Sequence, residues 1–419
     1  MYSSSRPSSY AWLMCALAAA FYCYEYLLRV MPAIIVPDLI ENLAITTTEV
    51  GLIASFYFLT YTPMQIFVGT IMDHFGVRLP LSIATLACAI GAYIFAIPTL
   101  ICAKIGMLLI GFGSAFAFVG VLKIAADWMP NKYFALVSGI TTTLGMIGAV
   151  SGETSLATVI DEHGIVFALY GLASIGVILA IILALAITDK QLLRSKKYLN
   201  ELQKLLFDLW FVAKNPQIWI AGLIGMLLYT PTTTFAGLWG VPYIQMTRAL
   251  SAHDAGQIIS MIFVGWAVGS PLVGLLTNWL RSRKKILVAS TLFTALTLIK
   301  IIYFPPDSQA ELMIWMFLLG VASSGEILVF AVAHDIIPNN LAGTAVSLTN
   351  MLVMVSGVMQ YMIGLLLETT KTASKTIVIH GVNTLQPYDY STAFLLMPIG
   401  LFIAAILSLF LKESYHLKP

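Results

Sequence analysis

The sequence predicts an all-α integral membrane protein, with twelve transmembrane helices in two pseudo-symmetric six-helix bundles. Of its 419 residues, 59% are hydrophobic and 10% are charged, whereas a soluble domain has about 25% charged residues. The length accommodates about twelve spans, because each needs about 20 apolar residues and a short loop. A polar stretch at 188–217 divides the apolar runs into six and six.

Apolar runs separated by short polar loops place the helices along the chain. We expect the first six at 10–37, 49–72, 79–98, 102–126, 133–157 and 165–187. We expect the second six at 217–241, 255–279, 286–304, 312–334, 341–367 and 391–411. Residues 1–187 and 218–419 would then form the two bundles, with 188–217 as a cytoplasmic linker.

The linker contains leucines at helical spacing, followed by Trp210 and Phe211, with lysines among them. This pattern predicts an amphipathic helix that lies on the membrane surface and tethers the two bundles. An ordinary charged linker is the alternative. The second long loop, 368–390, contains a segment at 376–383 that could form a small hairpin. Whether a partner subunit covers this loop is unknown from the sequence.

Positive charge is distributed unequally between the two sides. Fifteen of the 22 Lys and Arg residues lie on the side that holds both termini. The opposite side holds Arg248, Lys371 and Lys375, with Lys104 and Lys300 near helix ends. The positive-inside rule then predicts cytoplasmic termini in an inner membrane of bacterial type.

Several kinds of function are disfavoured by what the sequence contains. A net charge of +2 gives no basic field for a nucleic-acid partner. The six histidines and four cysteines are dispersed, so we expect no metal site. No Walker pattern occurs, so we expect no ATP and no other cofactor. An enzyme is not expected, because no nucleophile–base constellation appears. A non-transporting receptor built on a transporter scaffold is also disfavoured, because a receptor would need a soluble output domain and the sequence shows no long soluble segment.

A short motif recurs in the two halves. The loop after the second helix contains Gly69, Asp73, Gly76 and Arg78. The equivalent loop of the second half contains Gly274, Asn278 and Arg283. Both follow the pattern G-x-x-x-[D/N]-x-x-x-x-R at a turn on the side of the termini. Two six-helix halves with matching loops are typical of a transporter whose site lies at the midplane between them.

With this motif and the six-and-six division, the chain resembles the major facilitator superfamily over essentially its whole length. The resemblance implies secondary transport by alternating access. It implies that Gly69 allows close helix approach and that Asp73 and Arg78 can pair across the cytoplasmic ends of neighbouring helices. Such a latch would stabilise one access state and break in the other.

A finer resemblance lies in the first helix. Glu25–Pro32 is similar to the Y-x-x-R-V stretch of the anion:cation symporter branch and of the related lysosomal dipeptide-transporter group. Residues 127–130 (DWMP) are similar to the W-F-P segment of the same branch. In those relatives the first-helix arginine faces the cavity and meets a phosphate or carboxylate, which implies the same role for Arg29. The stretch 145–152 lacks the Gly-Pro pair of drug/proton antiporters.

Charged residues within the spans are the sharpest functional signal, because each costs about 2.5–3.5 kcal/mol at a helix centre. Glu25 and Arg29 are four residues apart and share a helix face with Tyr22 and Tyr26. We expect Arg29 to bind an anionic substrate group while Glu25 tunes it or carries a proton. A purely structural ion pair is the alternative.

Glu326 lies within its span among small residues. A carboxylate removed from water binds a proton more readily, so Glu326 is a candidate proton carrier. Recognition of a substrate amine and a hydrogen bond to a neighbouring helix are the alternatives. Lys123 is expected to pair with Asp127 at i,i+4.

The remaining charges are expected to be structural. Glu153 and Lys300 lie near the ends of their spans, where snorkelling is easy. His334 and Asp335 are expected to be polar groups of the cytoplasmic gate.

Aromatic and polar residues complete the predicted cavity. Tyr57, Tyr61 and Gln65 form a stripe at i, i+4 and i+8 in the second helix. Tyr229 precedes Pro231, which should break the seventh helix where a site is expected. Asn350 and Gln360 lie in the eleventh. Packing is the alternative for each of these residues.

These observations favour proton-coupled uptake of a small organic anion or zwitterion, such as a carboxylate, an organophosphate, a short peptide or a siderophore-like chelate. Arg29 would bind the anionic group, and Glu326 or Glu25 would couple proton binding to the switch. Glu25, Tyr22, Tyr26, Tyr57, Tyr61, Tyr229 and Asn350 would line the site. The alternative is a proton-driven exporter of an amphiphilic or cationic compound, bound by the carboxylates.

Overall fold

The computed structural model describes residues 9–130, 133–189, 198–338, 341–373, 378–379, 382–383 and 387–414. In this part of the chain, twelve helical spans are long and apolar enough to cross a membrane. Each coincides with one of the predicted apolar runs, with ends displaced by up to about two helical turns. The predicted fold class is therefore confirmed.

The spans are built from the following elements. The first six comprise α1 (Ser9–Leu43), α2 (Thr47–Phe75), α3 (Arg78–Phe95), α4 (Leu100–Ser114), α5 (Ala117–Trp128), α6 (Phe134–Glu153), α7 (Ser155–His163) and α8 (Ile165–Ala186). The linker contains α9 (Tyr198–Ala213). The next four comprise α10 (Pro216–Thr230), η2 (Pro231–Trp239), α11 (Gly240–Arg248), α12 (Ala252–Leu280), α13 (Arg283–Tyr303), α14 (Gln309–Ser323), η3 (Ser324–Ile327) and α15 (Leu328–Asp335). The last two comprise α16 (Ala342–Met354), η5 (Val355–Gly357), α17 (Val358–Ala373), α18 (Pro387–Phe394) and α19 (Leu396–Phe410), with strands β1 (Val378–Ile379) and β2 (Val382–Asn383) before α18.

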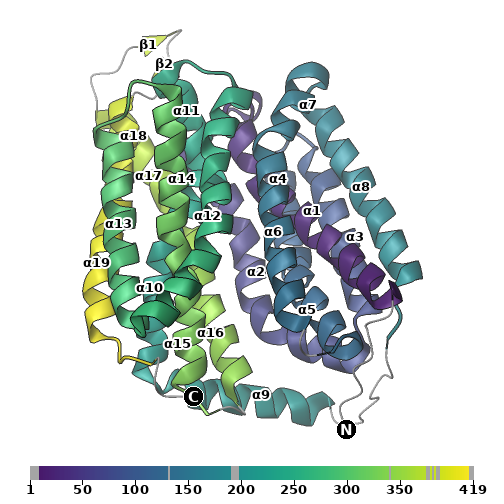
Figure 1. Ribbon diagram of the computed structural model, residues 1–419. Coiled ribbons are helices and arrows are strands. Elements are labelled where there is room, and N and C mark those ends of the chain that lie inside the picture. Colours follow the sequence, from purple (N-terminus) through teal and green to yellow (C-terminus); the bar gives the residue numbers. More distant parts are fainter. Residues whose placement is uncertain are drawn as a thin grey trace.

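Figure 1 shows α1–α8 on one side of the molecule and α10–α19 on the other, with α9 lying across one end. We call that end the α9 face; α1 begins there and α19 ends there. The strands β1 and β2 lie at the opposite end, the β-hairpin face. They pair antiparallel, Val378 with Asn383 and Ile379 with Val382, as expected for the segment 376–383.

Helix ends follow local sequence signals. Thr46 and Glu49 form a capping box at the start of α2: Glu49 N donates to Thr46 Oγ1 at 3.2 Å, and Thr46 N donates to Glu49 Oε2 at 2.9 Å. Gly76 and Gly164 follow α2 and α7 with φ of 78° and 85°. Only glycine adopts such backbone angles without strain, so both helices stop there.

Several spans are interrupted in the middle, among them the seventh and the tenth. The seventh widens into the π-helix η2, which starts at Pro231, a residue without an N–H donor. The tenth tightens into the 3₁₀ turn η3, which contains Glu326. In a membrane, backbone groups freed by such breaks need internal partners. One is supplied by α17 on the same side of the molecule, because Gln360 Nε2 donates to the carbonyl of Thr233 at 2.7 Å.

The two sides of the molecule meet along a seam in which α2 contacts α16 and α17, α12 contacts α6 and α7, and α1 contacts η2 and α11. The seam is closed near the β-hairpin face. There Thr47 Oγ1 donates to the carbonyl of Gly364 at 3.0 Å. The Cα of Gly256 in α12 packs against the carbonyl of Glu153 in α6, where a Cβ would overlap.

The helix α9 confirms the helix expected in the linker. Leu206, Phe207, Trp210 and Phe211 are exposed on it, whereas Val212 is buried. Its place on a lipid surface stays a prediction. Some of the charges used in the prediction of orientation lie outside the described residues: Arg6, Lys132, Lys190, Arg194, Lys196, Lys197, Lys375 and Lys418.

Candidate functional site

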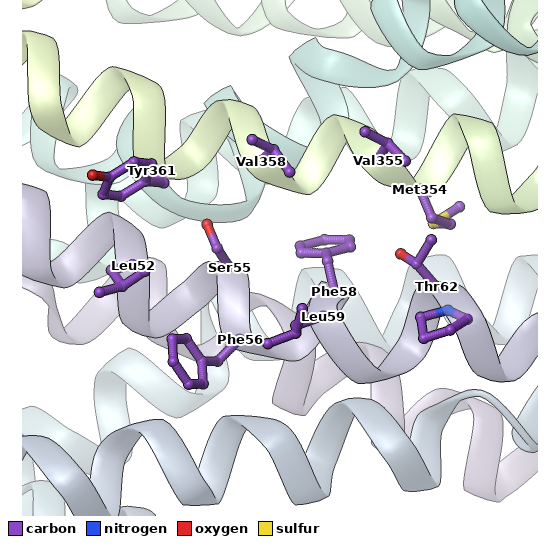
Figure 2. Close-up of a pocket in the computed structure, with 11 residues that line it drawn as sticks. Leu52, Ser55, Phe56, Phe58, Leu59, Thr62, Met354, Val355, Val358 and Tyr361 are labelled. Atoms are coloured by element: carbon purple, nitrogen blue, oxygen red, sulfur yellow. The ribbon is translucent and has the colours of Figure 1, made fainter.

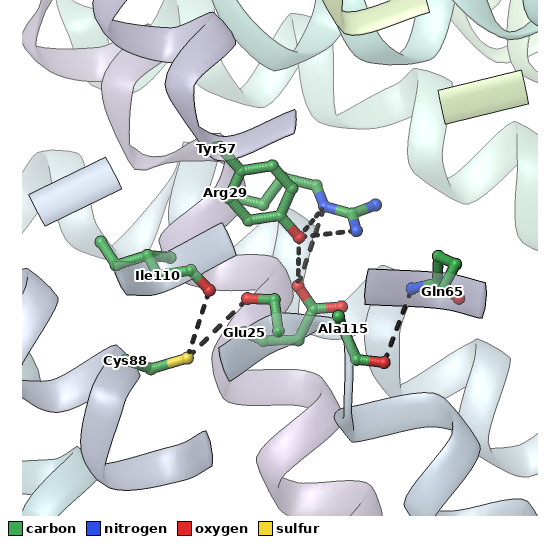
Figure 3. A network of polar contacts seen from close by, with 8 residues as sticks. Glu25, Arg29, Tyr57, Gln65, Cys88, Ile110 and Ala115 are labelled. Atoms are coloured by element: carbon green, nitrogen blue, oxygen red, sulfur yellow. Dashed lines mark hydrogen bonds and ion pairs between the residues drawn. The ribbon is translucent and has the colours of Figure 1, made fainter. Parts of the chain in front are cut away.

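The centre of the candidate site is a charged pair on α1, bridged by a tyrosine of α2. Arg29 Nε and Nη2 donate to the hydroxyl of Tyr57 at 2.9 and 2.7 Å. That hydroxyl donates to Glu25 Oε2 at 3.1 Å. Arg29 Nε and Glu25 Oε2 are 3.7 Å apart. Figure 3 shows the three side chains converging on the hydroxyl. The phenol therefore links two charges that are too far apart for a direct hydrogen bond.

Aromatic rings surround the guanidinium of Arg29. Its Cζ lies 4.6, 5.0 and 4.9 Å from the ring centroids of Tyr26, Tyr57 and Tyr61. Tyr57 and Tyr61 stack on each other with centroids 5.3 Å apart, and Tyr22 packs edge-on against Tyr26 at 5.0 Å. Cation–π attraction is strongest for a desolvated cation. The rings therefore fix the position of Arg29 while leaving it positively charged.

Glu25 is fully buried on the opposite side of the bridge. Its Oε1 has no hydrogen-bond partner among the residues that the structure describes. Unpartnered buried carboxylate oxygens are uncommon, because each lost hydrogen bond costs free energy. The i,i+4 pairing predicted for Glu25 and Arg29 is confirmed, and the bridging hydroxyl is an addition that the spacing alone did not reveal.

A small cavity lies beside Arg29 at the seam. Its volume is about 10 Å³, room for about one water molecule. Both sides of the seam contribute to its wall, which includes Tyr26, Arg29, Phe58, Tyr229, Thr232, Thr233, Phe263 and Gln360. In this conformation, residues from both sides of the seam enclose the space beside Arg29.

Glu326 lies across the seam from the charged pair, on η3. It is 3% exposed. Ser324 and Gly325 precede it, and Gly325 is so close to Ser290 of α13 that a Cβ would overlap the serine side chain. The small residues predicted around Glu326 therefore serve helix packing, and they leave the carboxyl inside the protein.

One predicted site residue is placed elsewhere. Asn350 of α16 does not line the small cavity; its Nδ2 donates to Gln65 Oε1 at 3.1 Å. Gln65 Nε2 in turn reaches the carbonyl of Ala115 at 3.5 Å (Figure 3). The bond between Asn350 and Gln65 joins α16 to α2 across the seam, so Asn350 holds the two sides together in this conformation.

The motif loop at the α9 face departs from the expected pairing. Asp73 forms an ion pair with Lys123 of α5 at 2.7 Å, and Lys123 also contacts Asp127 at 3.4 Å. Arg78 Nε instead donates to the carbonyl of Ala184 at 2.6 Å. The direct Asp73–Arg78 pairing is therefore wrong for this conformation, because a lysine on α5 lies closer to the aspartate. The Lys123–Asp127 pair is confirmed.

The two motif glycines also have different surroundings. A Cβ at Gly69 would meet nothing within 4 Å, so the close helix approach expected there is wrong in this conformation. A Cβ at Gly76 would overlap the carboxylate of Asp189. The same carboxylate accepts hydrogen bonds from the backbone N–H groups of Val77 and Arg78, at 2.7 and 3.1 Å. The loop is thus fastened to the segment that follows α8.

The other charged residues in or near the spans differ in whether their side chains have polar partners. Lys300 Nζ donates to the carbonyl of Phe304 at 2.9 Å at an exposed helix end, as snorkelling predicts. Asp335 forms an ion pair with Arg283 at the α9 face, and its Oδ1 lies 3.3 Å from His334 Nδ1. Glu153, however, is completely buried, so the snorkelling expected for it is wrong. The reason is that α6 ends at this residue against α12, which covers it.

A larger cavity of about 470 Å³ lies between α2 and α17, with an apolar lining (Figure 2). Leu59 and Val358 are among its exposed walls. Phe58 lines both this cavity and the small one beside Arg29. One aromatic ring therefore stands between the charged site and an apolar groove on the outer surface.

Sequence reasoning underrated the polar groups of η2. The hydroxyls of Thr232 and Thr234 are buried and have no hydrogen-bond partner in the described part of the chain, and Thr233 Oγ1 contacts Ser356 Oγ at 3.3 Å. The run of threonines after Pro231 was the available signal, since a broken membrane helix marks the binding sites of many transporters. The described residues hold no group of three or more His, Cys, Asp or Glu side chains suited to a metal.

The Major Facilitator Superfamily profile matches residues 14–360. The chain belongs to this superfamily. The transporter is 28% identical over 160 residues to "Uncharacterized transporter YybO" of Bacillus subtilis strain 168, covering 36% of this chain and 35% of that protein. It is 23% identical over 379 residues to "Probable sulfoacetate transporter SauU" of Cupriavidus necator H16, covering 86% and 88%. The alignment thus spans about a third of the first relative and most of the second.

Among solved structures, the transporter is similar to a bacterial homologue of the human lysosomal transporter Spinster in an inward-facing, occupied conformation. The TM-score is 0.73 at 14% identity, covering 96% of this chain and 97% of that one. At this identity the likeness shows the fold alone. The family membership and the twelve spans together make the chain a multi-pass membrane protein and a secondary transporter, not an enzyme.

Proposed function

We propose that the transporter moves a small organic anion or zwitterion by proton-coupled uptake, with Arg29 binding the anionic group. The observation that carries this proposal is the position of Arg29, a buried cation that lines the cavity at the seam. Tyr57 takes two of the five N–H donors of its guanidinium. A planar guanidinium is suited to bidentate binding of a carboxylate, sulfonate or phosphate.

The name of one relative supports a small organic anion as the substrate. The Cupriavidus protein, aligned over most of both chains, is named for sulfoacetate, a small organic anion. The threonines of η2 and Gln360 add hydroxyl and amide groups across the cavity from Arg29. We infer a compact anion whose charged end meets Arg29 and whose polar end meets η2.

Protons would be coupled through carboxylates on the two sides of the seam. Glu25 and Arg29 both bond to the hydroxyl of Tyr57. A substrate anion near Arg29 would partly neutralise the positive charge that stabilises the Glu25 carboxylate. Protonation of Glu25 would then become more favourable. Glu326 is buried without an ion pair in the described part of the chain. A proton on either group neutralises a charge that is costly to hold inside a membrane.

The two bundles, 1–187 and 218–419, would rock about this site, and 188–217 would tether them. We also infer that the α9 face is cytoplasmic, in an inner membrane. The described cations at that face include Arg78, Lys204, Lys214, Arg281, Arg283, Lys284, Lys285 and Lys412. Alkaline phosphatase fused after residue 414 should be inactive, and fused within 304–308 should be active; the reverse pattern would contradict this orientation.

The test of function is transport in proteoliposomes with sulfoacetate, succinate, a dipeptide and a lipophilic cation as probes. Arg29→Gln should weaken binding of the transported anion about 10- to 100-fold, the range for one charge-assisted contact. Lys300→Gln removes an exposed cation as the matched control and should transport normally. Unchanged anion transport by Arg29→Gln would overturn the proposal.

Coupling is tested separately. Glu326→Gln, or Glu25→Gln, should abolish accumulation driven by a pH gradient while preserving exchange of labelled for unlabelled substrate, because exchange needs no net proton movement. If both variants still accumulate substrate with the gradient, these carboxylates do not carry the coupled proton.

A second candidate function is export of an amphiphilic or cationic compound. The apolar groove favours it, since Phe58 alone lines both the groove and the Arg29 cavity. In this case the lipophilic cation would bind, Arg29→Gln would leave its binding unchanged, and Glu25→Gln would reduce it.

A further inference from the structure

Glu153 is a buried carboxyl that the proposed transport mechanism does not use. It is the last residue of α6, it is 0% exposed, and neither Oε1 nor Oε2 has a hydrogen-bond partner among the described residues. A buried, unpaired carboxylate would cost many kcal/mol, and the group avoids this cost by holding a proton. The geometry therefore describes a neutral carboxyl.

Its position is at the closed end of the seam. The backbone of Glu153 contacts Gly256 of α12 so closely that a Cβ there would overlap its carbonyl. Ile34 of α1 lies 3.5 Å from the same Cβ position of Gly256, and the neighbouring Gly152 packs on Val30. Figure 1 shows α6 and α12 side by side at the seam. The backbone of Glu153 therefore lies in the contact between the two sides of the molecule, and its buried carboxyl belongs to the same residue at this contact.

Next to Glu153, polar contacts cross the same interface. His253 Nδ1 lies 2.9 Å from Thr158 Oγ1 and 3.3 Å from the carbonyl of Thr154, and Gln257 Nε2 lies 2.8 Å from His253 Nε2. These contacts join His253 to Thr158, Thr154 and Gln257, and none of them reaches the carboxyl of Glu153. His253 therefore adds polar contacts across the interface without donating a hydrogen bond to Glu153.

Other charged groups do not compensate Glu153 either. The acidic, basic and histidine residues on the elements packed around it are Glu25, Arg29, Asp38 and Glu41 of α1, Lys123 and Asp127 of α5, Asp161, Glu162 and His163 of α7, and His253 and Asp254 of α12. In the described part of the chain, none of these donates a hydrogen bond to its carboxyl.

We propose that Glu153 is a proton-binding site of the gate at the β-hairpin face. In the closed state the carboxyl holds its proton. When α6 and α12 separate, water reaches the group, the O–H bond breaks, the proton leaves to water and the carboxylate is hydrated. Closing requires the proton to return. A low pH on this face therefore favours the closed gate.

This inference concerns the gate, and it does not depend on the substrate or on Arg29. It is tested by a distance measurement without substrate, so failure of the proposed transport function would not affect the result. Val166→Cys in α8 and Gln309→Cys in α14 carry spin labels, in a background whose four native cysteines are replaced. Both positions are exposed near the β-hairpin face, on opposite sides of the seam.

Pulsed electron paramagnetic resonance then gives the populations of short (closed) and long (open) distances from about pH 5 to about pH 9, a range that spans carboxyl and histidine titration. In the otherwise unchanged protein, the open-to-closed ratio should rise with pH, by up to about tenfold per pH unit for one proton. In Glu153→Gln and in Glu153→Met, two variants that cannot titrate, the ratio should stay constant. Glu162→Gln, which changes an exposed carboxyl of α7, should respond like the unchanged protein.

Three results would overturn the proposal. The first is a ratio that does not change with pH in the unchanged protein. The second is a full pH response in both Glu153 variants. The third is a response that persists in the Glu153 variants and disappears in His253→Gln, which would assign the proton to the imidazole.

Discussion

Replacement of Tyr57 by phenylalanine tests whether one hydroxyl holds the charged pair together. The substitution keeps the ring that contacts Arg29 and removes only the oxygen. That oxygen accepts two hydrogen bonds from Arg29 and donates one to Glu25. Because Arg29 Nε and Glu25 Oε2 are 3.7 Å apart, they cannot replace the lost bonds without moving.

The expected loss follows from the number and type of these bonds. A hydrogen bond to a charged group contributes about 1.5–3 kcal/mol. The three bonds share one oxygen atom and are therefore not additive, so we expect the free energy of unfolding to fall by about 2–4 kcal/mol. Both charged groups are buried, so water cannot take the place of the hydroxyl at low cost.

The assay is thermal unfolding in detergent, compared at one scan rate. For a chain of 419 residues, a loss of this size should lower the apparent Tm by about 2–5 °C. Tyr24→Phe is the matched control. Tyr24, on α1, is buried like Tyr57, but its hydroxyl donates only one hydrogen bond, at 2.9 Å, to the neutral carbonyl of Leu172. That control should lose about 1 kcal/mol. Equal effects of the two substitutions would refute the bridging role of Tyr57.

Two other substitutions test the ends of the molecule. Gly256→Ala places a Cβ against the backbone of α6 and should shift the spin-label distances toward the open state. Gly274→Ala, whose Cβ would meet nothing within 4 Å, is the control and should leave the distances unchanged. If Gly256→Ala stays closed, the contact between Gly256 and α6 does not hold the seam shut. Arg283→Met leaves Asp335, 7% exposed, without its arginine and should lower the free energy of unfolding by about 3 kcal/mol, measured by denaturant titration. A change below about 1 kcal/mol would show that the pair is not needed.

The twelve spans were predictable because a membrane admits few alternatives: every backbone group must be paired internally, so each long apolar run becomes a helix. The pairing of Glu25 with Arg29 was predictable for a similar reason, since i,i+4 neighbours lie on one helix face. The break at Pro231 also followed from the residue itself, although its form as a π-helix did not.

Contacts between helices were harder to predict. The bridge by Tyr57 and the pairing of Asp73 with Lys123 join residues far apart in the sequence, and no local spacing reveals them. Glu153 was misjudged because its place near the end of an apolar run suggested access to water. Only the packing of α12 against that end shows that the carboxyl is enclosed.

The closed seam is built in large part from main-chain atoms. Three glycines bring one side against carbonyl groups of the other: Gly51 on Gln360, Gly256 on Glu153 and Gly364 on Thr47. Main-chain surfaces have no rotamers to freeze, so bringing them together costs little side-chain conformational entropy. Their attraction is short-ranged dispersion with weak Cα–H···O contacts. Such surfaces can part and rejoin many times without repacking, which leaves the balance between open and closed to a few polar groups.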